Sequence, residues 1–249
     1  MKLSSRLLSV IAIAALLGAG CGPTAAPTAG TGSSGGLFGG GSSASACNNP
    51  YYPFTPNTSI VYGMTGVDSD FTMATLPPTA GGDHKLEYTF IVRGTTNKIS
   101  QEFTCQNGSI RAKGHLDFAS AFGQGISFET ISTTGEFLPA DLSTGKKWTS
   151  EYKVKIMVSN EQLKALLDGK EQTMKITSEV LGEESVTVPA GTYTAKKIKQ
   201  VIETSNPALP TTIKIEQTIW LVRDIGLVKS EVISQGGTPS KMEAKVVNR

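Results

Sequence analysis

The sequence predicts a mainly β protein: one strongly curved antiparallel sheet, a half-barrel or open barrel, with one short helix. Three observations support this prediction. After Cys47, apolar and polar residues alternate with a period of two along most of the chain, as half-buried strands require. The alternating runs are longer than the about five or six residues typical of strands. Short turns join them, and a row of roughly ten such strands must curve or close to cover its apolar face.

The first segment predicts export. Two cations near the start precede an apolar run, Leu7 to Leu17, and three small residues. This order is typical of a secretory signal peptide over residues 1–20, and the run is too short to span a bilayer as a helix. The small residues followed by Cys21 resemble the lipobox of bacterial lipoproteins, which implies that Cys21 is lipidated and becomes the new N-terminus. The alternative is an ordinary secreted protein, cut after Ala19 or Gly20.

Residues 21–46 begin with the lipidated cysteine and continue as a linker of Gly, Ser, Ala, Thr and Pro with few large apolar side chains. Such a composition cannot bury enough surface to offset its backbone entropy, so we expect a disordered tether. Residues 47–249 then form a single β domain. The tether would hold this domain close to the cell membrane or outer membrane, facing the periplasm or the cell exterior.

The strands follow from the alternation. In the first well-defined run, Leu86, Tyr88 and Phe90 share one face and charged or polar residues share the other. The dipeptide Asn107-Gly108 predicts a tight hairpin turn between the second and third runs. The expected strands cover residues 85–93, 99–105, 108–112, 147–158, 173–181, 192–203, 211–222, 226–234 and 241–247.

One segment breaks the alternation. Residues 160–168 begin with a capping-box-like sequence, carry Leu163, Leu166 and Leu167 at helical spacing, and stop at Gly169. We therefore expect a short helix that plugs one end of the sheet. The alternative is an irregular loop whose leucines reach the core.

Three passages of the domain resemble bacterial exported lipoproteins of unknown function. The resemblance covers residues 47–235 and is strongest in a "YYP" opening that leads to the first strand, a "VPAGTF"-like turn and a "GLVK" turn: Tyr51-Tyr52-Pro53-Phe54-Thr55-Pro56-Asn57-Thr58-Ser59-Ile60-Val61-Tyr62, Val188-Pro189-Ala190-Gly191-Thr192-Tyr193 and Ile225-Gly226-Leu227-Val228-Lys229. It implies an architecture similar to LolA/LppX-type half-barrels, which hold lipid. The matched positions suit turns rather than catalysis.

The cysteines left after acylation of Cys21 are Cys47 and Cys105. Export places both outside the reducing cytosol, so we expect one disulfide between them. The alternative is that Cys105 is a small buried apolar residue and Cys47 is free.

The composition offers little material for catalysis. The net charge is +2, without the basic excess of a nucleic-acid binder. His84 and His115 are expected as solvated turn histidines; a metal or general-base site would need them to meet Asp83 or Asp117. We therefore expect no catalytic residue, no metal site and no cofactor, and a protein that is not an enzyme.

Three functions are weighed. The first is a non-enzymatic binding module for an apolar ligand on the concave face. The second is a structural or envelope-interaction lipoprotein whose core is filled by Trp148, Tyr152, Trp220 and the helix. The third, an envelope enzyme, would need a histidine beside a Ser or Asp. Expected partners are the membrane, through the lipid anchor, and an apolar ligand or an envelope protein; nucleic acid is excluded and the protein is expected to be a monomer.

Overall fold

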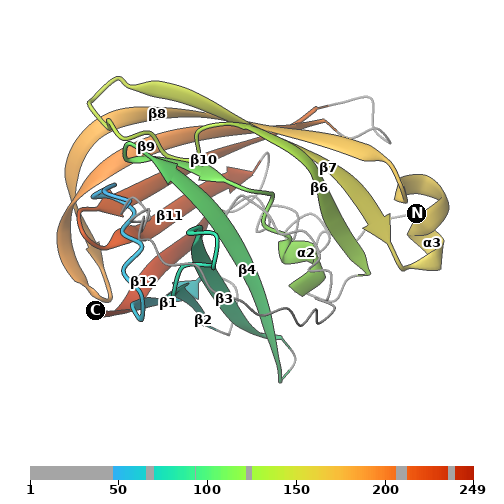
Figure 1. Cartoon of the computed structure of the whole chain (residues 1–249), viewed down its shortest axis with the longest axis horizontal. Coiled ribbons are helices and arrows are strands. Elements are labelled where there is room, and N and C mark those ends of the chain that lie inside the picture. Colours follow the sequence, from blue (N-terminus) through green and yellow to red (C-terminus); the bar gives the residue numbers. More distant parts are fainter. Residues whose placement is uncertain (1–46, 66–69, 93, 122–124, 206–211, 235–238) are drawn as a thin grey trace, which may run out of the picture.

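A computed structural model describes residues 47–65, 70–92, 94–121, 125–205, 212–234 and 239–249. In chain order it contains strands and two helices with the bounds β1 Ser59–Met64, β2 Phe71–Leu76, β3 His84–Val92, β4 Thr95–Gln106, β5 Ser109–Ala112, α2 Phe118–Ala121, β6 Ile126–Gly135, β7 Lys147–Val158, α3 Glu161–Leu167, β8 Glu171–Val188, β9 Gly191–Ser205, β10 Thr212–Val222, β11 Gly226–Ser234 and β12 Ser240–Asn248. The strands form one 12-stranded antiparallel sheet that curves almost into a closed barrel (Figure 1). The predicted fold class is confirmed.

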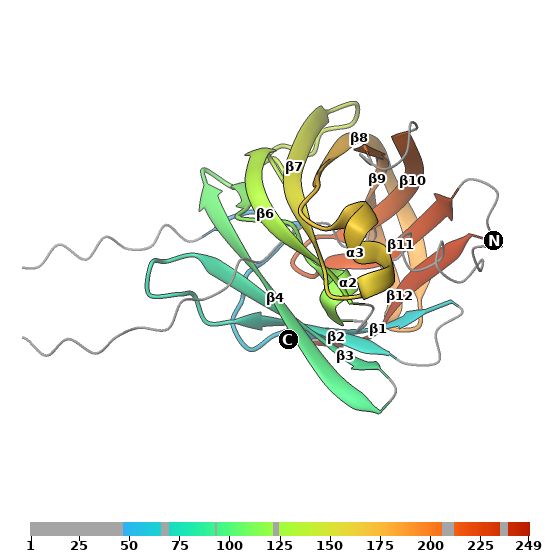
Figure 2. The same ribbon diagram turned by 90° about the vertical axis from the view of Figure 1, so that its right-hand side faces the viewer.

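The sheet closes at the ends of the chain and stays open at its middle. Its order is β5-β4-β3-β2-β1-β12-β11-β10-β9-β8-β7-β6, so every strand pairs with its neighbour in sequence except β5 with β6. The first and last strands pair from Ser59 opposite Asn248 to Met64 opposite Met242. The missing ladder between β5 and β6 is called the seam below. It lies where the chain leaves the sheet to form α2 (Figure 2).

Most strand expectations are confirmed, and the differences have local causes. The turn at Asn107 and Gly108 has positive φ at both residues, 50° and 79°, as a tight hairpin requires. Strand β8 runs past its expected end at Leu181 as far as Val188, with a bulge in its pairing with β9 between Val180 and Gly182. Strands β1, β2 and β6 were not among the expected ranges.

The core lies on the concave face of the sheet. One row of aromatic side chains crosses β3, β2 and β1, with Phe90 opposite Phe71 and Phe71 opposite Tyr62. The rings stack at centroid distances of 5.0 Å in both contacts. Burying each such side chain stabilises the fold by about 1.5–3 kcal/mol.

Helix α3 is confirmed, but its predicted role as a plug is wrong. Asn160 caps the helix by accepting a hydrogen bond from the Gln162 amide at 2.9 Å. None of its residues is buried, and Leu166 remains 53% exposed. The helix contacts β7 and lies beyond the end of that strand, at the right-hand edge of Figure 1.

Helix α2, which the sequence did not predict, packs against the core in the way expected of α3. Its Phe118 is 1% exposed and contacts the rings of Tyr88 and Phe90 edge to face at 5.9 and 5.4 Å. The helix has four residues, which is too few to show a helical period.

Trp220 is 4% exposed and belongs to the buried core cluster with Trp148 and Tyr152, so its expected burial is confirmed, although it lies on the opposite face of β10 from the inner side chains. The inner side chains of β10 are at odd positions, such as Ile215 and the buried Gln217, and Trp220 points the other way. Its ring lies between the ammonium groups of Lys197 and Lys229, at 5.5 and 4.8 Å from its centroid.

Candidate functional site

The seam is bridged by side chains in place of a ladder. Beside α2, Asp117 Oδ2 accepts the Phe128 amide of β6 at 3.0 Å. Further along, Thr130 Oγ1 accepts the His115 amide at 2.9 Å, and the Thr133 hydroxyl donates to the carbonyl of Ala112 at 3.2 Å. These bonds join β6 to the segment that follows β5. The seam is the part of the wall where single side-chain bonds replace a backbone ladder.

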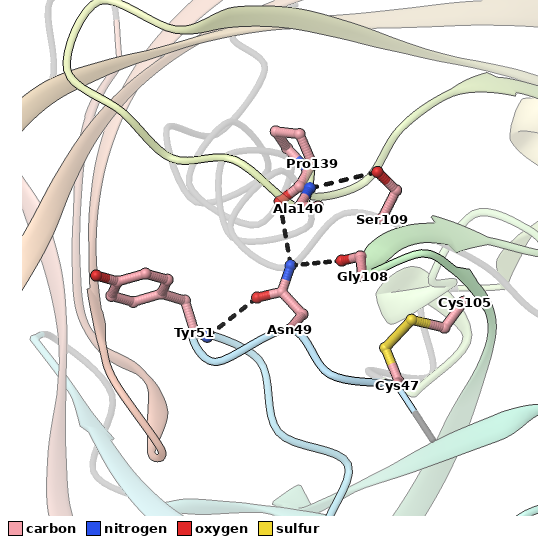
Figure 3. The surroundings of a disulfide bond; sticks show 8 residues. All are labelled: Cys47, Asn49, Tyr51, Cys105, Gly108, Ser109, Pro139 and Ala140. Atoms are coloured by element: carbon pink, nitrogen blue, oxygen red, sulfur yellow. Dashed lines mark hydrogen bonds between the residues drawn. A yellow bond between two sulfur atoms is a disulfide. The ribbon is translucent and has the colours of Figure 1, made fainter. Parts of the chain in front are cut away.

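At its other end the seam is held by backbone bonds and by Asn49. Ile110 and Leu138 form an isolated antiparallel bridge with an amide-to-carbonyl distance of 2.8 Å. The buried Asn49 donates to the carbonyls of Gly108 at 2.9 Å and Pro139 at 3.1 Å, and accepts the Tyr51 amide at 3.0 Å (Figure 3). One side chain therefore ties the opening segment to both sides of the seam.

The opening segment is also attached covalently. Cys47 and Cys105 form a disulfide across a sequence separation of 58, with their Cα atoms 5.5 Å apart (Figure 3). The expected lipidation site, Cys21, lies outside the described residues.

The three passages that resemble exported lipoproteins have structural contacts. The Asp224 amide donates to the carbonyl of Pro50 at 2.7 Å, which brings the opening segment against the turn before β11. The Tyr62 hydroxyl donates to the carbonyl of Leu227 at 2.6 Å. In the "VPAGTF"-like passage, the Tyr193 hydroxyl donates to the Ala190 carbonyl within the β8–β9 turn at 2.8 Å. These contacts assign the motifs to holding the wall together.

Five polar side chains gather on the inner face, and they come from both sides of the seam. We call them the polar cluster: Tyr52, Tyr88, Gln101, His115 and Tyr152. Tyr88 on β3 and Gln101 on β4 share the inner face with Leu86, which pairs with Gln101. Tyr152 comes from β7, on the other side of the seam. Tyr52 enters from the opening segment, and His115 from the segment after β5.

The contacts among the members form two groups. The amide of Lys113 donates to the carbonyl of Glu102 at 2.9 Å, which brings the segment that leads to His115 beside Gln101 on β4. The Tyr88 hydroxyl lies 3.5 Å from Gln101 Oε1, and Tyr52 is hydrogen-bonded to Tyr88. The rings of His115 and Tyr152 have centroids 6.1 Å apart. His115 also meets the ring of Phe128 edge to face at 5.7 Å.

The polar cluster is uncharged at neutral pH. Burial lowers the pKa of His115 to about 4. Burial also raises the pKa of Tyr52, partly offset by the hydrogen bond with Tyr88, and raises that of Tyr152 to about 12. Removing these groups from water disfavours their ionised forms. Among the described residues no buried side chain is Lys, Arg, Asp or Glu, so the inner face offers a ligand no formal charge.

Two members of the polar cluster have unpaired polar atoms. Gln101 is 0% and His115 is 2% exposed. Gln101 Nε2 and His115 Nδ1 are both buried and have no hydrogen-bond partner. A buried polar atom without a partner costs about 1–3 kcal/mol, so native structures contain few of them. These two atoms could bind a ligand group that both accepts and donates hydrogen bonds.

The expected solvated state of His115 is wrong, because the chain bends after β5 and places the ring in the interior. His84 is partly buried and stacks on Phe54 at 4.5 Å, and burial lowers its pKa. The carboxylates weighed as their partners are engaged elsewhere, Asp83 with Lys113 at 2.6 Å and Asp117 at the seam. In the described ranges no three His, Cys, Asp or Glu side chains gather as a metal site requires.

Sequence reasoning missed the polar cluster. Tyr88 and Tyr152 were expected on the inner faces of their strands, but as apolar filling. Gln101 lies on the same face of β4 as the buried Phe103, and a glutamine at such a position is a signal in the sequence that could have indicated a polar site.

In the described part of the chain, no helix has both the length and the apolar character needed to cross a bilayer.

Two solved structures share the fold. One is a protein from Bacteroides fragilis described as exported with a YmcC-like fold: 15% identity, 78% of this chain and 97% of that chain covered, TM-score 0.54. The other, from Parabacteroides distasonis, is described as a lipoprotein: 20% identity, 80% and 99% covered, TM-score 0.54. No curated protein matches the chain.

The family model described as DUF3108-like matches residues 94–242. This range contains β4 to β11 entirely and most of the inner wall. The expected resemblance to exported lipoproteins of unknown function is confirmed. Because the match covers more than half of the sequence, the chain belongs to the DUF3108-like family.

Proposed function

We propose that this protein is a lipid-anchored lipoprotein of the cell envelope that holds an apolar ligand inside its barrel and catalyses no reaction. The leader over residues 1–20, Cys21 and the tether that follows support the location. The protein would stand at the membrane surface, where apolar molecules are available.

The observation that carries the proposal is the composition of the inner face. The sheet encloses an apolar, largely aromatic wall on which no buried side chain of the described residues carries a charge. Beside α2, the seam of this wall is held by single side-chain hydrogen bonds. Opening the seam breaks few hydrogen bonds, so it is the least costly route to the interior.

A test uses the chain from Gly22 onward, exported behind a cleavable secretory leader that replaces residues 1–21. This form keeps every described residue and carries no acyl chain of its own. Native mass spectrometry of the purified protein should detect a bound lipid-sized species, and the protein should take up the uncharged fluorophore N-phenyl-1-naphthylamine. Absence of both would contradict the proposal and favour the alternative, an envelope-interaction protein with a filled core.

A further inference from the structure

The two buried polar atoms without partners point to a specific site within the barrel. A glutamine and a histidine on an otherwise apolar wall are costly to the fold unless something bonds to them. Elsewhere on the same wall the buried polar side chains are paired. Gln217 Nε2, for example, donates to Ser230 Oγ at 2.9 Å. Gln101 and His115 differ from Gln217 in this respect, although all three are almost fully buried.

We propose that Gln101 and His115 bind the polar end of an uncharged amphiphile, an acyl chain that ends in a group bearing hydroxyl or ester oxygens. The proposal rests on the proposed function and names its ligand class. Gln101 Nε2 would donate to a ligand oxygen. His115 Nδ1 would bond to a ligand hydroxyl, which can either donate or accept.

The surroundings exclude a charged polar end. An ionised carboxylate or phosphate moved from water into this interior loses its hydration, and that loss is offset only by a buried cation or several donors. The buried residues of the described chain include no Lys or Arg, and His115 stays neutral because burial lowers its pKa to about 4. A glyceryl or similar end meets the same groups without that cost.

The polar cluster also lies where a ligand would arrive. Its members come from β3 and β4 on one side of the seam and from β7 on the other. Next to it, Tyr88 contacts Phe118, which contacts Phe90 in the aromatic row. The cluster therefore borders both the seam and the apolar wall, which suits a molecule with one polar end and one apolar end.

The test is displacement of N-phenyl-1-naphthylamine from the same exported chain, with 1-oleoylglycerol and oleate as competitors at pH 8. The two have the same acyl chain and differ in the charge of the polar end. We expect 1-oleoylglycerol to displace the fluorophore at a concentration at least about 10-fold lower than oleate needs. This factor corresponds to one hydrogen bond to a buried group.

Two matched variants separate the site from the fold. Gln101→Met removes the unpaired Nε2 and also Oε1, the acceptor 3.5 Å from the Tyr88 hydroxyl. It should weaken the binding of 1-oleoylglycerol by at least about 10-fold and lower the melting temperature less than Gln217→Met does. Gln217→Met removes a paired donor from the same wall, so it should lower the melting temperature and leave the affinity within about 2-fold.

The outcomes distinguish the two proposals. If the fluorophore does not bind, the proposed function itself fails. If it binds and oleate competes as well as 1-oleoylglycerol, the barrel holds apolar ligands but the uncharged polar subsite is refuted. If Gln101→Met leaves the affinity for 1-oleoylglycerol unaltered, the ligand forms no hydrogen bond with Gln101, and the subsite is likewise refuted.

Discussion

At the scale of single residues, the polar side chains of the interior fall into two groups with opposite consequences. Asn49 is buried and uses its amide fully, on two carbonyls and one backbone amide. Gln101 and His115 are buried and each leave one atom unpaired. The first group stabilises the fold, and the second lowers stability in a way that a ligand can reverse.

Asn49→Ala should lower the free energy of unfolding by about 2–4 kcal/mol, because the Gly108 and Pro139 carbonyls and the Tyr51 amide lose their partner together. Urea unfolding measures the loss. Asn97→Ala removes a bond that is exposed to solvent and should change stability by less than about 0.5 kcal/mol. Equal effects of the two substitutions would contradict the role assigned to Asn49.

His115 should make stability depend on pH. Its pKa is lowered from 6.5 to about 4 in the folded protein, so between these values the unfolded chain binds more protons than the native one. Stability therefore falls as pH falls through this window, by about 3 kcal/mol in total.

The measurement is the free energy of unfolding at several pH values from 7 to 4, for the unchanged protein and for His115→Phe. The variant should show a flatter dependence than the unchanged protein. His84→Phe, at a partly exposed histidine, should flatten it less. Parallel curves for His115→Phe and the unchanged protein would show that the ring is protonated freely in the native state.

At the scale of elements, the core position expected of α3 is occupied by α2, a helix that the sequence did not predict. Helix α3 has the longer apolar pattern and yet lies outside the barrel, while the single turn of α2 inserts Phe118 into the core. Helical spacing shows that a segment can form a helix. It does not show whether the apolar side of that helix meets the sheet.

Phe118→Ala should lower the free energy of unfolding by about 3–5 kcal/mol, the range for removing a large aromatic side chain from a packed core. Leu166→Ala, on the 53% exposed leucine of α3, should change stability by less than about 0.5 kcal/mol. Thermal unfolding of both variants tests the assignment, and a larger loss for Leu166→Ala would reverse it.

The disulfide links the opening segment to the end of β4. Closing a loop with a sequence separation of 58 stabilises the fold by about 4 kcal/mol in the chain-entropy treatment. Cys47→Ser and Cys105→Ser should lower the melting temperature by similar amounts, and the double variant should add little. Two alkylatable thiols in the denatured, unreduced protein would show that the bond does not form in the exported chain.

At the scale of the whole molecule, the meander closes where its two ends meet and remains unpaired at its middle. β1 and β12 pair through a backbone ladder with one register shift between Val61 and Tyr62, whereas the seam beside α2 depends on side chains such as Asp117, Thr130 and Thr133. Local opening should therefore start at the seam.

Amide hydrogen exchange can test this. The amides of Phe128 and His115, which donate to side chains across the seam, should exchange at least about 100-fold faster than those in the β9–β10 ladder. Equal protection would mean that the seam opens only with global unfolding, and the route proposed for ligand entry would be lost.

Much of the fold was predictable because strands and turns depend on patterns of neighbouring residues. The alternation of Leu86, Tyr88 and Phe90 identifies β3, and Asn107-Gly108 identifies the β4–β5 turn, since both patterns act over neighbouring residues. Strand β6 has no such pattern. As an edge strand it alternates poorly between buried and exposed residues, and Ile131 is 46% exposed.

The candidate site was largely unpredictable because its members are distant in sequence. Tyr52 and Tyr152 come close only when the sheet curves until β7 faces the opening segment. The burial of His115 depends on a bend after β5, and no periodicity marks a bend. Trp220 illustrates the same limit: its aromatic character predicts burial, and only the tertiary structure shows that its ring, 4% exposed, lies between the ammonium groups of Lys197 and Lys229.

By itself, the sequence determined the strands, the hairpin turns, the presence of α3 and the family, because each depends on contiguous residues and on the period of the backbone. Only the tertiary structure decided that β12 closes onto β1, that the seam falls between β5 and β6, and that Gln101 and His115 share one uncharged interior. Those features depend on the total curvature of the sheet, to which every strand contributes through its twist. The total curvature cannot be read from any single segment of the chain.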